Sequence, residues 1–80
     1  MTIEVRLFAT FASYLPPGSG GGTAMIEMPQ GSTVDDVAAH LGIPSSLPRI
    51  ALVNGQDADP GRRLSSGDIV TLFPPLAGGS

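Results

Sequence analysis

The chain has 80 residues, of which 41% are apolar and 14% are charged, and its formal net charge is −3. This length supports one small domain, and the low charge content argues against an intrinsically disordered chain. Eleven glycines and eight prolines impose many turns and short elements, which excludes a helical bundle. The four cationic residues are too few to form a nucleic-acid footprint.

Several residue types that enzymes depend on are missing. The sequence has no lysine, which excludes a Walker phosphate loop and Schiff-base chemistry. It has no cysteine, which excludes disulfides, thiolate nucleophiles and cysteine metal sites. The single histidine, His40, cannot build a histidine cluster for a metal.

No targeting or membrane segment is expected. Glu4 and Arg6 interrupt the start of the chain, and no apolar signal region follows them. The longest uncharged stretch, residues 7–26, contains two prolines and four glycines, so it does not predict a transmembrane helix. The sequence therefore predicts a cytoplasmic protein.

The first part of the chain predicts two strands with a short helical turn between them. Residues 2–8 alternate strictly between the two faces, as in a half-buried strand, and residues 23–28 alternate again. Between them, residues 9–15 can form a helical turn that packs Phe11 and Leu15 on the domain. The expected inward residues of the two strands are Ile3, Val5, Leu7, Ala24, Ile26 and Met28.

A helix follows, because the apolar period changes from two to about 3.6 residues. Its apolar stripe consists of Val34, Val37, Ala38 and Leu41. Ser32 or Thr33 can cap its start, and two aspartates stand in its first turn, where carboxylates suit the helix dipole. Gly42 and Pro44 indicate its end.

The remaining chain predicts a third strand at residues 50–53, a tight turn at Asn54-Gly55, and a last strand at residues 69–73. The first and last strands are strongly apolar and can pair in parallel at the centre of a sheet. The expected fold is α+β, with a mixed sheet of four to five strands packed on one main helix and a short extra helical turn. This is the β-grasp, or ubiquitin-like, arrangement, predicted for residues 1–75 and followed by a flexible tail at residues 76–80.

Polar candidates inside the domain favour structural roles. His40 lies off the apolar stripe without an acidic partner at helical spacing, which predicts a surface histidine. Three aspartates could form a weak oxygen-ligand set, but their sequence context is ordinary turn chemistry, so no metal is expected. They are Asp57, Asp59 and Asp68.

Two loops also invite a functional reading. Residues 18–22 are glycine-rich, but Thr23 stands where a dinucleotide fingerprint needs glycine, which favours a linker. Arg62 and Arg63 form the only adjacent basic pair, interpreted as a solvated loop with a partner contact as the open alternative.

The C-terminal segment carries the most specific signal. From Val70 it reads Val-Thr-Leu-Phe-Pro-Pro-Leu-Ala-Gly-Gly-Ser. The two prolines favour an extended chain, and Gly78-Gly79 carries no Cβ, so the tail can thread a narrow channel and present an open carboxyl group. Residues 76–79 span about 13 Å when extended, enough to reach into another protein's active site.

The sequence resembles the MoaD/ThiS sulfur-carrier family, particularly the molybdopterin synthase small-subunit type. The resemblance covers nearly the whole chain, and its most specific part is the closing Phe-Pro-Pro-Leu-Ala-Gly-Gly. It rests on residues 5–9, Val53-Asn54-Gly55, Leu64 with Gly67-Asp68, and residues 72–79.

The resemblance implies a sulfur carrier for molybdenum or tungsten cofactor biosynthesis. An E1-like enzyme would adenylate the carboxyl group of Gly79 with ATP, and sulfur would displace AMP to leave a thiocarboxylate. This small, non-catalytic subunit would then bind the large synthase subunit, with no cofactor, metal, nucleic acid or membrane of its own. Gly78 and Ala77 would thread into the partner, and the contact would involve Phe73, Pro74, Pro75 and Leu76. On periodicity alone, Phe73 could equally close the domain core.

Ser80 departs from the family pattern, because such a carrier must end in glycine to be activated. It is a remnant of expression, the end of a precursor that a protease trims, or a sign that the chain is no carrier. Two other functions share the fold and terminus: a ubiquitin-like protein modifier, and a carrier for thiamine or cysteine synthesis.

Overall fold

The computed structural model describes residues 1–16 and 21–75. Its elements, in chain order, are β1 (Thr2–Leu7), the 3-10 helix η1 (Ala9–Tyr14), β2 (Thr23–Glu27), α1 (Val34–His40), β3 (Ile50–Val53), β4 (Gln56–Asp57) and β5 (Ile69–Phe73).

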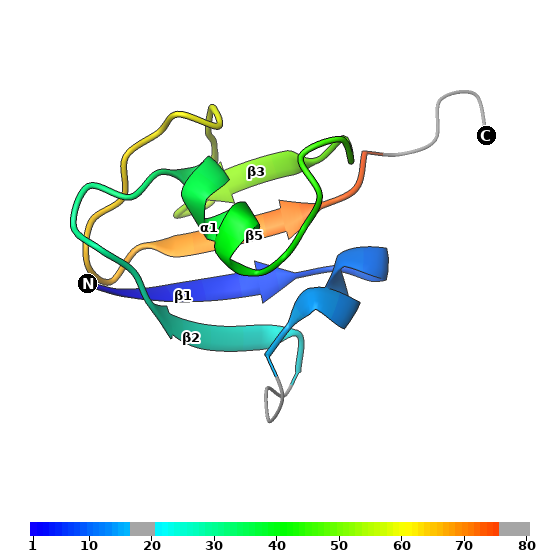
Figure 1. The fold of residues 1–80 in the computed structure, drawn as a ribbon, viewed down its shortest axis with the longest axis horizontal. Coiled ribbons are helices and arrows are strands. Elements are labelled where there is room, and N and C mark those ends of the chain that lie inside the picture. Colours follow the sequence, from blue (N-terminus) through cyan, green and yellow to red (C-terminus); the bar gives the residue numbers. More distant parts are fainter. Residues whose placement is uncertain (17–20, 76–80) are drawn as a thin grey trace.

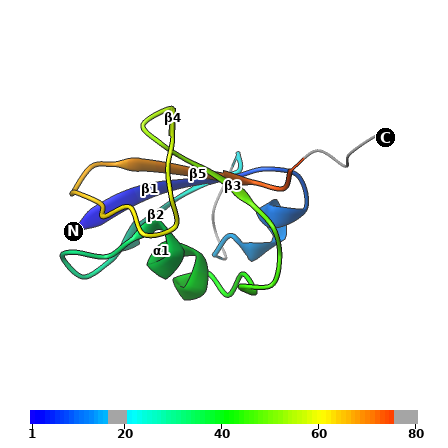
Figure 2. The same cartoon turned by 90° about the horizontal axis from the view of Figure 1, so that it is seen from above.

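The strands form one mixed sheet of five strands in the order β2-β1-β5-β3-β4. β1 and β5 pair in parallel, with Leu7 opposite Leu72, and the other neighbouring strands pair antiparallel. α1 and η1 lie on the same side of this sheet (Figures 1 and 2). The predicted β-grasp fold, with its parallel pair of first and last strands, is confirmed.

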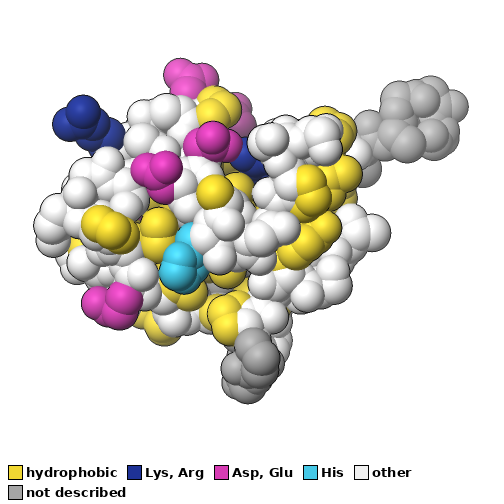
Figure 3. Space-filling model, in the orientation of Figure 1, with side chains coloured by type: hydrophobic (Ala, Val, Ile, Leu, Met, Phe, Trp, Pro, Cys, Tyr) yellow, Lys and Arg dark blue, Asp and Glu magenta, His cyan; other side chains and the backbone are white. Residues whose placement is uncertain are grey.

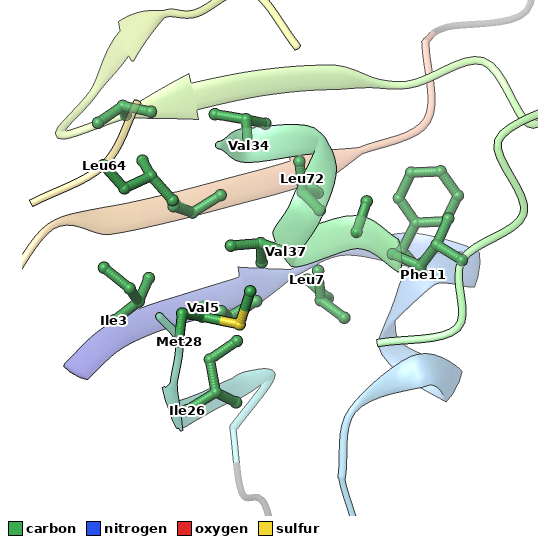
Figure 4. Close-up of a cluster of buried hydrophobic side chains, with 14 residues drawn as sticks. Ile3, Val5, Leu7, Phe11, Ile26, Met28, Val34, Val37, Leu64 and Leu72 are labelled. Atoms are coloured by element: carbon green, nitrogen blue, oxygen red, sulfur yellow. The ribbon is translucent and has the colours of Figure 1, made fainter. Parts of the chain in front are cut away.

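The hydrophobic core lies between the sheet and α1. Figure 4 shows the inward side chains of β1, β2 and β5 meeting those of α1. From α1 the core receives Val34, Val37 and Ala38, as the apolar stripe predicts. Phe11 of η1 is 2% exposed and contacts Tyr14 edge-on, with ring centroids 6.3 Å apart. The opposite side of the sheet has no helix over it among the described residues (Figure 2).

Both ends of α1 are closed by local hydrogen bonds. Thr33, not Ser32, is the N-cap: its hydroxyl accepts from the Asp36 N–H, and the Asp36 carboxylate accepts from the Thr33 N–H. Ser32 instead donates to the Pro29 carbonyl at 2.7 Å. At the other end, Gly42 has φ of +83° and its N–H donates to Ala39, while the next N–H donates to Ala38. This is a Schellman motif, so the helix ends where Gly42 predicts.

The first strand ends one residue earlier than the alternation predicts. Ala9 has φ of +54°, a left-handed conformation that turns the chain out of β1 and into η1. The second strand likewise ends at Glu27 rather than at residue 28.

The tight turn after β3 is confirmed. Asn54 and Gly55 both have positive φ, +52° and +85°, as a two-residue hairpin turn of this hand requires. The turn pairs Val53 with Gln56, and β4 is only two residues long.

No helix in the described part of the chain is long and apolar enough to span a membrane.

Candidate functional site

The predicted tail follows the sheet's middle strand. β5 lies between β1 and β3, and it ends at Phe73 followed by Pro74 and Pro75. The predicted site residues Leu76, Ala77, Gly78 and Gly79, and Ser80 after them, lie outside the described residues. The described site is therefore the surface from which this segment departs.

Three apolar residues are neighbours in the sheet at that point: Ile50 of β3, Phe73 of β5, and Phe8, which directly follows β1. Ile50 is the register partner of Phe73, and Leu7 is the partner of Leu72, which places Phe8 beside Phe73. A hydrogen bond from the Phe8 N–H to the Leu72 carbonyl, 3.2 Å long, continues the pairing of β1 and β5 to this residue. With the two prolines, these residues form what we call the tail-root patch: Phe8, Ile50, Phe73, Pro74 and Pro75.

Phe8, Ile50 and Phe73 of the tail-root patch lie on the helix-free side of the sheet. Val70 and Leu72 are buried under α1, so alternation directs Ile69, Thr71 and Phe73 to the opposite face. Phe8 has an extended backbone, follows buried Leu7, and is 52% exposed. Phe73 is half-buried outside the core cluster, so it does not close the core.

Phe8 is a candidate that the sequence reasoning missed. The strand prediction covered it, but only the inward residues of that strand were assigned a role. The signal was present in the sequence, because strict alternation places this aromatic side chain on the outward face. The structure agrees, since Phe8 is more exposed than a core residue would be.

The rest of the helix-free face is mixed. Leu52 and Ile69 are half-buried, and Met25 is 61% exposed. Arg6 forms an ion pair with Glu4 at 2.6 Å in the middle of this face. The face therefore presents apolar surface that continues from the tail-root patch, and it also carries the Arg6–Glu4 pair and the Glu27 carboxylate.

Two of the motifs quoted for the resemblance, Val53-Asn54-Gly55 and Gly67-Asp68, contact each other and fix the start of β5. Asn54 donates to the Asp68 carboxylate at 3.1 Å and accepts from the Ile69 N–H at 3.0 Å. The other Asp68 oxygen accepts from the Ser65 N–H at 2.8 Å, and the Asp68 carbonyl accepts from the Glu4 N–H at 3.0 Å. These bonds set the register of β5 against β1 and so the position where the tail begins.

The other polar candidates are placed apart from this site. His40 is exposed in the last turn of α1, as predicted. Asp57 and Asp59 are exposed, and both Asp68 carboxylate oxygens already accept hydrogen bonds. Across residues 1–16 and 21–75, no group of three histidine, aspartate or glutamate side chains could hold a metal ion.

The basic pair lies beside the start of α1. The Arg62 carbonyl accepts from the Val34 N–H at 3.0 Å, and Arg63 forms an isolated bridge with Thr33. Both residues are exposed. On the α1 side of the molecule, the cationic side chains do not gather into one patch (Figure 3).

A mixed five-stranded sheet on one helix, whose central strand leads into a Gly-Gly segment, defines a ubiquitin-like β-grasp protein. The model of the ThiS family matches residues 5–79, and the chain belongs to this family of sulfur-carrier and ubiquitin-like proteins. A search among curated proteins found no match.

Similar solved structures come from archaea and bacteria. The Haloferax volcanii HVO 2177 protein is 31% identical, with a TM-score of 0.79, over 99% of this chain and 87% of that one. SAMP1 from Haloferax volcanii is 28% identical, with a TM-score of 0.73, over 99% of this chain and 100% of that one.

A third similar structure is a complex of subunits 1 and 2 of molybdopterin-converting factor from Helicobacter pylori. The matched chain is 22% identical, with a TM-score of 0.62, over 99% of this chain and 100% of that one. At this identity the likeness shows the shared fold.

Proposed function

We propose that this protein carries sulfur for molybdopterin biosynthesis as a thiocarboxylate at Gly79, formed after Ser80 is removed. The observation that carries the proposal is that the family match extends through Gly78-Gly79, which follow a central strand bordered by exposed apolar surface. The Helicobacter pylori complex supports a large-subunit partner, since that protein's subunit 1 shares this fold and binds subunit 2.

The chemistry requires two steps at the terminal carboxyl group. A Gly79 oxygen attacks the α-phosphorus of ATP in the E1-like enzyme, which releases pyrophosphate and leaves an acyl adenylate. A hydrosulfide-equivalent nucleophile then attacks the acyl carbon, AMP departs, and a thiocarboxylate remains. Glycine suits both steps because no side chain shields the acyl carbon. ATP is bound by the activating enzyme, and the chain itself requires no permanent cofactor.

The tail-root patch would anchor the chain on the activating enzyme and on the large synthase subunit. A peptide segment alone binds weakly, because ordering a peptide costs conformational entropy. Aromatic residues in an interface core contribute a disproportionate share of binding energy. Phe8 and Phe73 lie where the tail departs, so a partner that binds them receives the tail close to its own active site.

Reconstitution with the cognate activating enzyme, ATP and a sulfur donor tests the proposal. Intact mass spectrometry should show sulfur replacing one oxygen in the chain that ends at Gly79. The full chain ending at Ser80 and a chain ending at Gly78 are matched controls and should stay unchanged. If the Gly79 form shows neither an adenylate nor the exchange, the proposal is wrong.

A second candidate function is protein modification, favoured by the 28% identity to SAMP1, named a small archaeal modifier protein. Here a lysine amine of a target would attack the activated Gly79 and form an isopeptide bond. Because this chain has no lysine, it cannot form lysine-linked chains on itself. Blotting host lysate separates the two functions: a ladder of conjugates favours the modifier, and a thiocarboxylate without a ladder favours the carrier.

A further inference from the structure

The outer edge of β2 presents unpaired backbone groups. Among the described residues, β2 is the terminal strand of the sheet and pairs only with β1. Met1 and Met28 exchange both hydrogen bonds, each 2.8 Å long, at one end of this pair, and the Leu7 N–H donates to Gly22 at the other. Antiparallel hydrogen-bonded pairs occur at every second position. The N–H and C=O groups of Thr23, Met25 and Glu27 therefore point away from β1.

This edge lacks most of the features that usually protect a terminal strand, and its one charged residue is Glu27. Residues 23–27 contain no proline and no lysine, and the register with β1 runs without a bulge. Met25, in the middle of the strand, is 61% exposed. The opposite edge of the sheet is different, because β4 has only two residues and offers little to pair with.

We propose that β2 is a self-association site, at which β2 of a second copy pairs antiparallel about a twofold axis at Met25. For the outward backbone groups to pair, Met25 must lie opposite Met25 of the second copy, and Thr23 must lie opposite Glu27 of the second copy. Each of these pairs exchanges two hydrogen bonds. On the core side of the joined sheet, Ala24 would lie opposite Ile26 of the second copy, which adds apolar contact.

The charged side chains near the β2 edge favour a second copy of this chain as the partner that binds there. Arg6 is the register partner of Thr23, so Arg6, Thr23 and Glu27 of the second copy would form one row across the joined sheet. The Arg6 Nε atom pairs with Glu4, but this side chain is 47% exposed, and its other guanidinium N–H groups can reach over threonine toward that carboxylate. The twofold axis repeats the interaction, and no two like charges stand directly opposite each other.

The expected interface is one strand wide, smaller than that of a stable dimer, so association should be weak and concentration-dependent. The tail departs from β5, which is separated from β2 by β1. Both tail-root patches would therefore stay accessible in the dimer, and the inference does not rest on the proposed function.

A single introduced cysteine tests whether two copies meet at Met25, because the chain itself contains no cysteine. Paired residues of this type have Cα atoms about 5.5 Å apart, within reach of a disulfide. Under mild oxidation, Met25→Cys should form a covalent dimer about tenfold faster than Ser45→Cys, an exposed control in the loop after α1. Equal rates for the two variants would overturn the proposal.

Sedimentation of the natural sequence from about 10 μM to about 1 mM provides an independent test. We expect a monomer–dimer equilibrium that Met25→Lys abolishes, since two lysines would face each other at the axis. Glu27→Arg alone should weaken association, and adding Arg6→Glu should restore it. A monomer at every concentration would overturn the proposal, as would association that none of these variants changes.

Discussion

At the scale of single residues, Asn54 connects the hairpin turn to the start of the central strand. Its backbone is left-handed, with φ of +52°, and its amide bonds both Asp68 and the Ile69 N–H. Asparagine tolerates this conformation better than most residues and can also make both hydrogen bonds. The position therefore demands asparagine for two separate reasons.

Replacing Asn54 should separate these contributions. We expect Asn54→Ala to lower the free energy of unfolding by about 2–3 kcal/mol, through two lost hydrogen bonds and left-handed strain. Asn54→Gly keeps the conformation and should cost about 1 kcal/mol less than the alanine variant. Urea denaturation measures both, with Gln56→Ala as an exposed control in the same hairpin. Equal stability of Asn54→Ala and the control would contradict this account.

Phe8 should contribute to binding far more than to folding. Because it is 52% exposed, Phe8→Ala should change the unfolding free energy by less than about 1 kcal/mol. Because Phe8 is proposed to anchor the interface, its loss should weaken binding to the large subunit or the activating enzyme by about 2 kcal/mol, or roughly thirtyfold. Calorimetry with Leu47→Ala, another exposed apolar residue, provides the control. Equal affinities of the two variants would contradict the assignment.

Leu76 is predicted to behave in the same way, although it lies outside the described residues. Leu76→Ala should leave the melting temperature nearly unchanged and weaken binding to the same partners. If calorimetry finds wild-type affinity for both partners, Leu76 is not part of the anchor, and docking must rest on Phe8, Phe73 and the rest of the open sheet face.

At the scale of elements, α1 depends on its cap. It has only seven residues, too few to be stable alone, so local capping and core contacts hold it in place. We expect Thr33→Ala to lower the unfolding free energy by about 1 kcal/mol and Thr33→Ser to cost much less, because serine retains the capping hydroxyl. Thermal or urea unfolding tests this, and identical stability of the two variants would show that the capping box contributes nothing.

The elements themselves could be predicted because their signals are local. Strands 50–53 and 69–73 have the bounds that their apolar runs indicate, and Gly42 ends the helix as expected. The bonds between elements could not be predicted this way. Asn54 and Asp68 are separated by 14 residues, and so are Asp35 and Arg49, which form an ion pair. Such contacts depend on where the folded chain brings each turn, which no periodicity encodes.

At the scale of the whole molecule, the residues that stabilise the fold and those proposed to bind partners lie on opposite sides of the sheet. The helices lie on one side of the sheet (Figure 2), and alternation directs Phe8 and Phe73 to the other side. The alternation of β5 predicted both faces, but it left the role of Phe73 open. Deciding between core and surface required the position of α1, a tertiary fact that places Phe73 opposite the helix.

The central claim is that Gly79 is the group that becomes activated. The most direct measurement is the intact mass of this protein isolated from its host, in cells that lack the large synthase subunit, with the thiocarboxylate trapped by alkylation during lysis. We predict a chain that ends at Gly79 with one oxygen replaced by alkylated sulfur. A chain that always retains Ser80 with an unmodified carboxyl group would contradict the account.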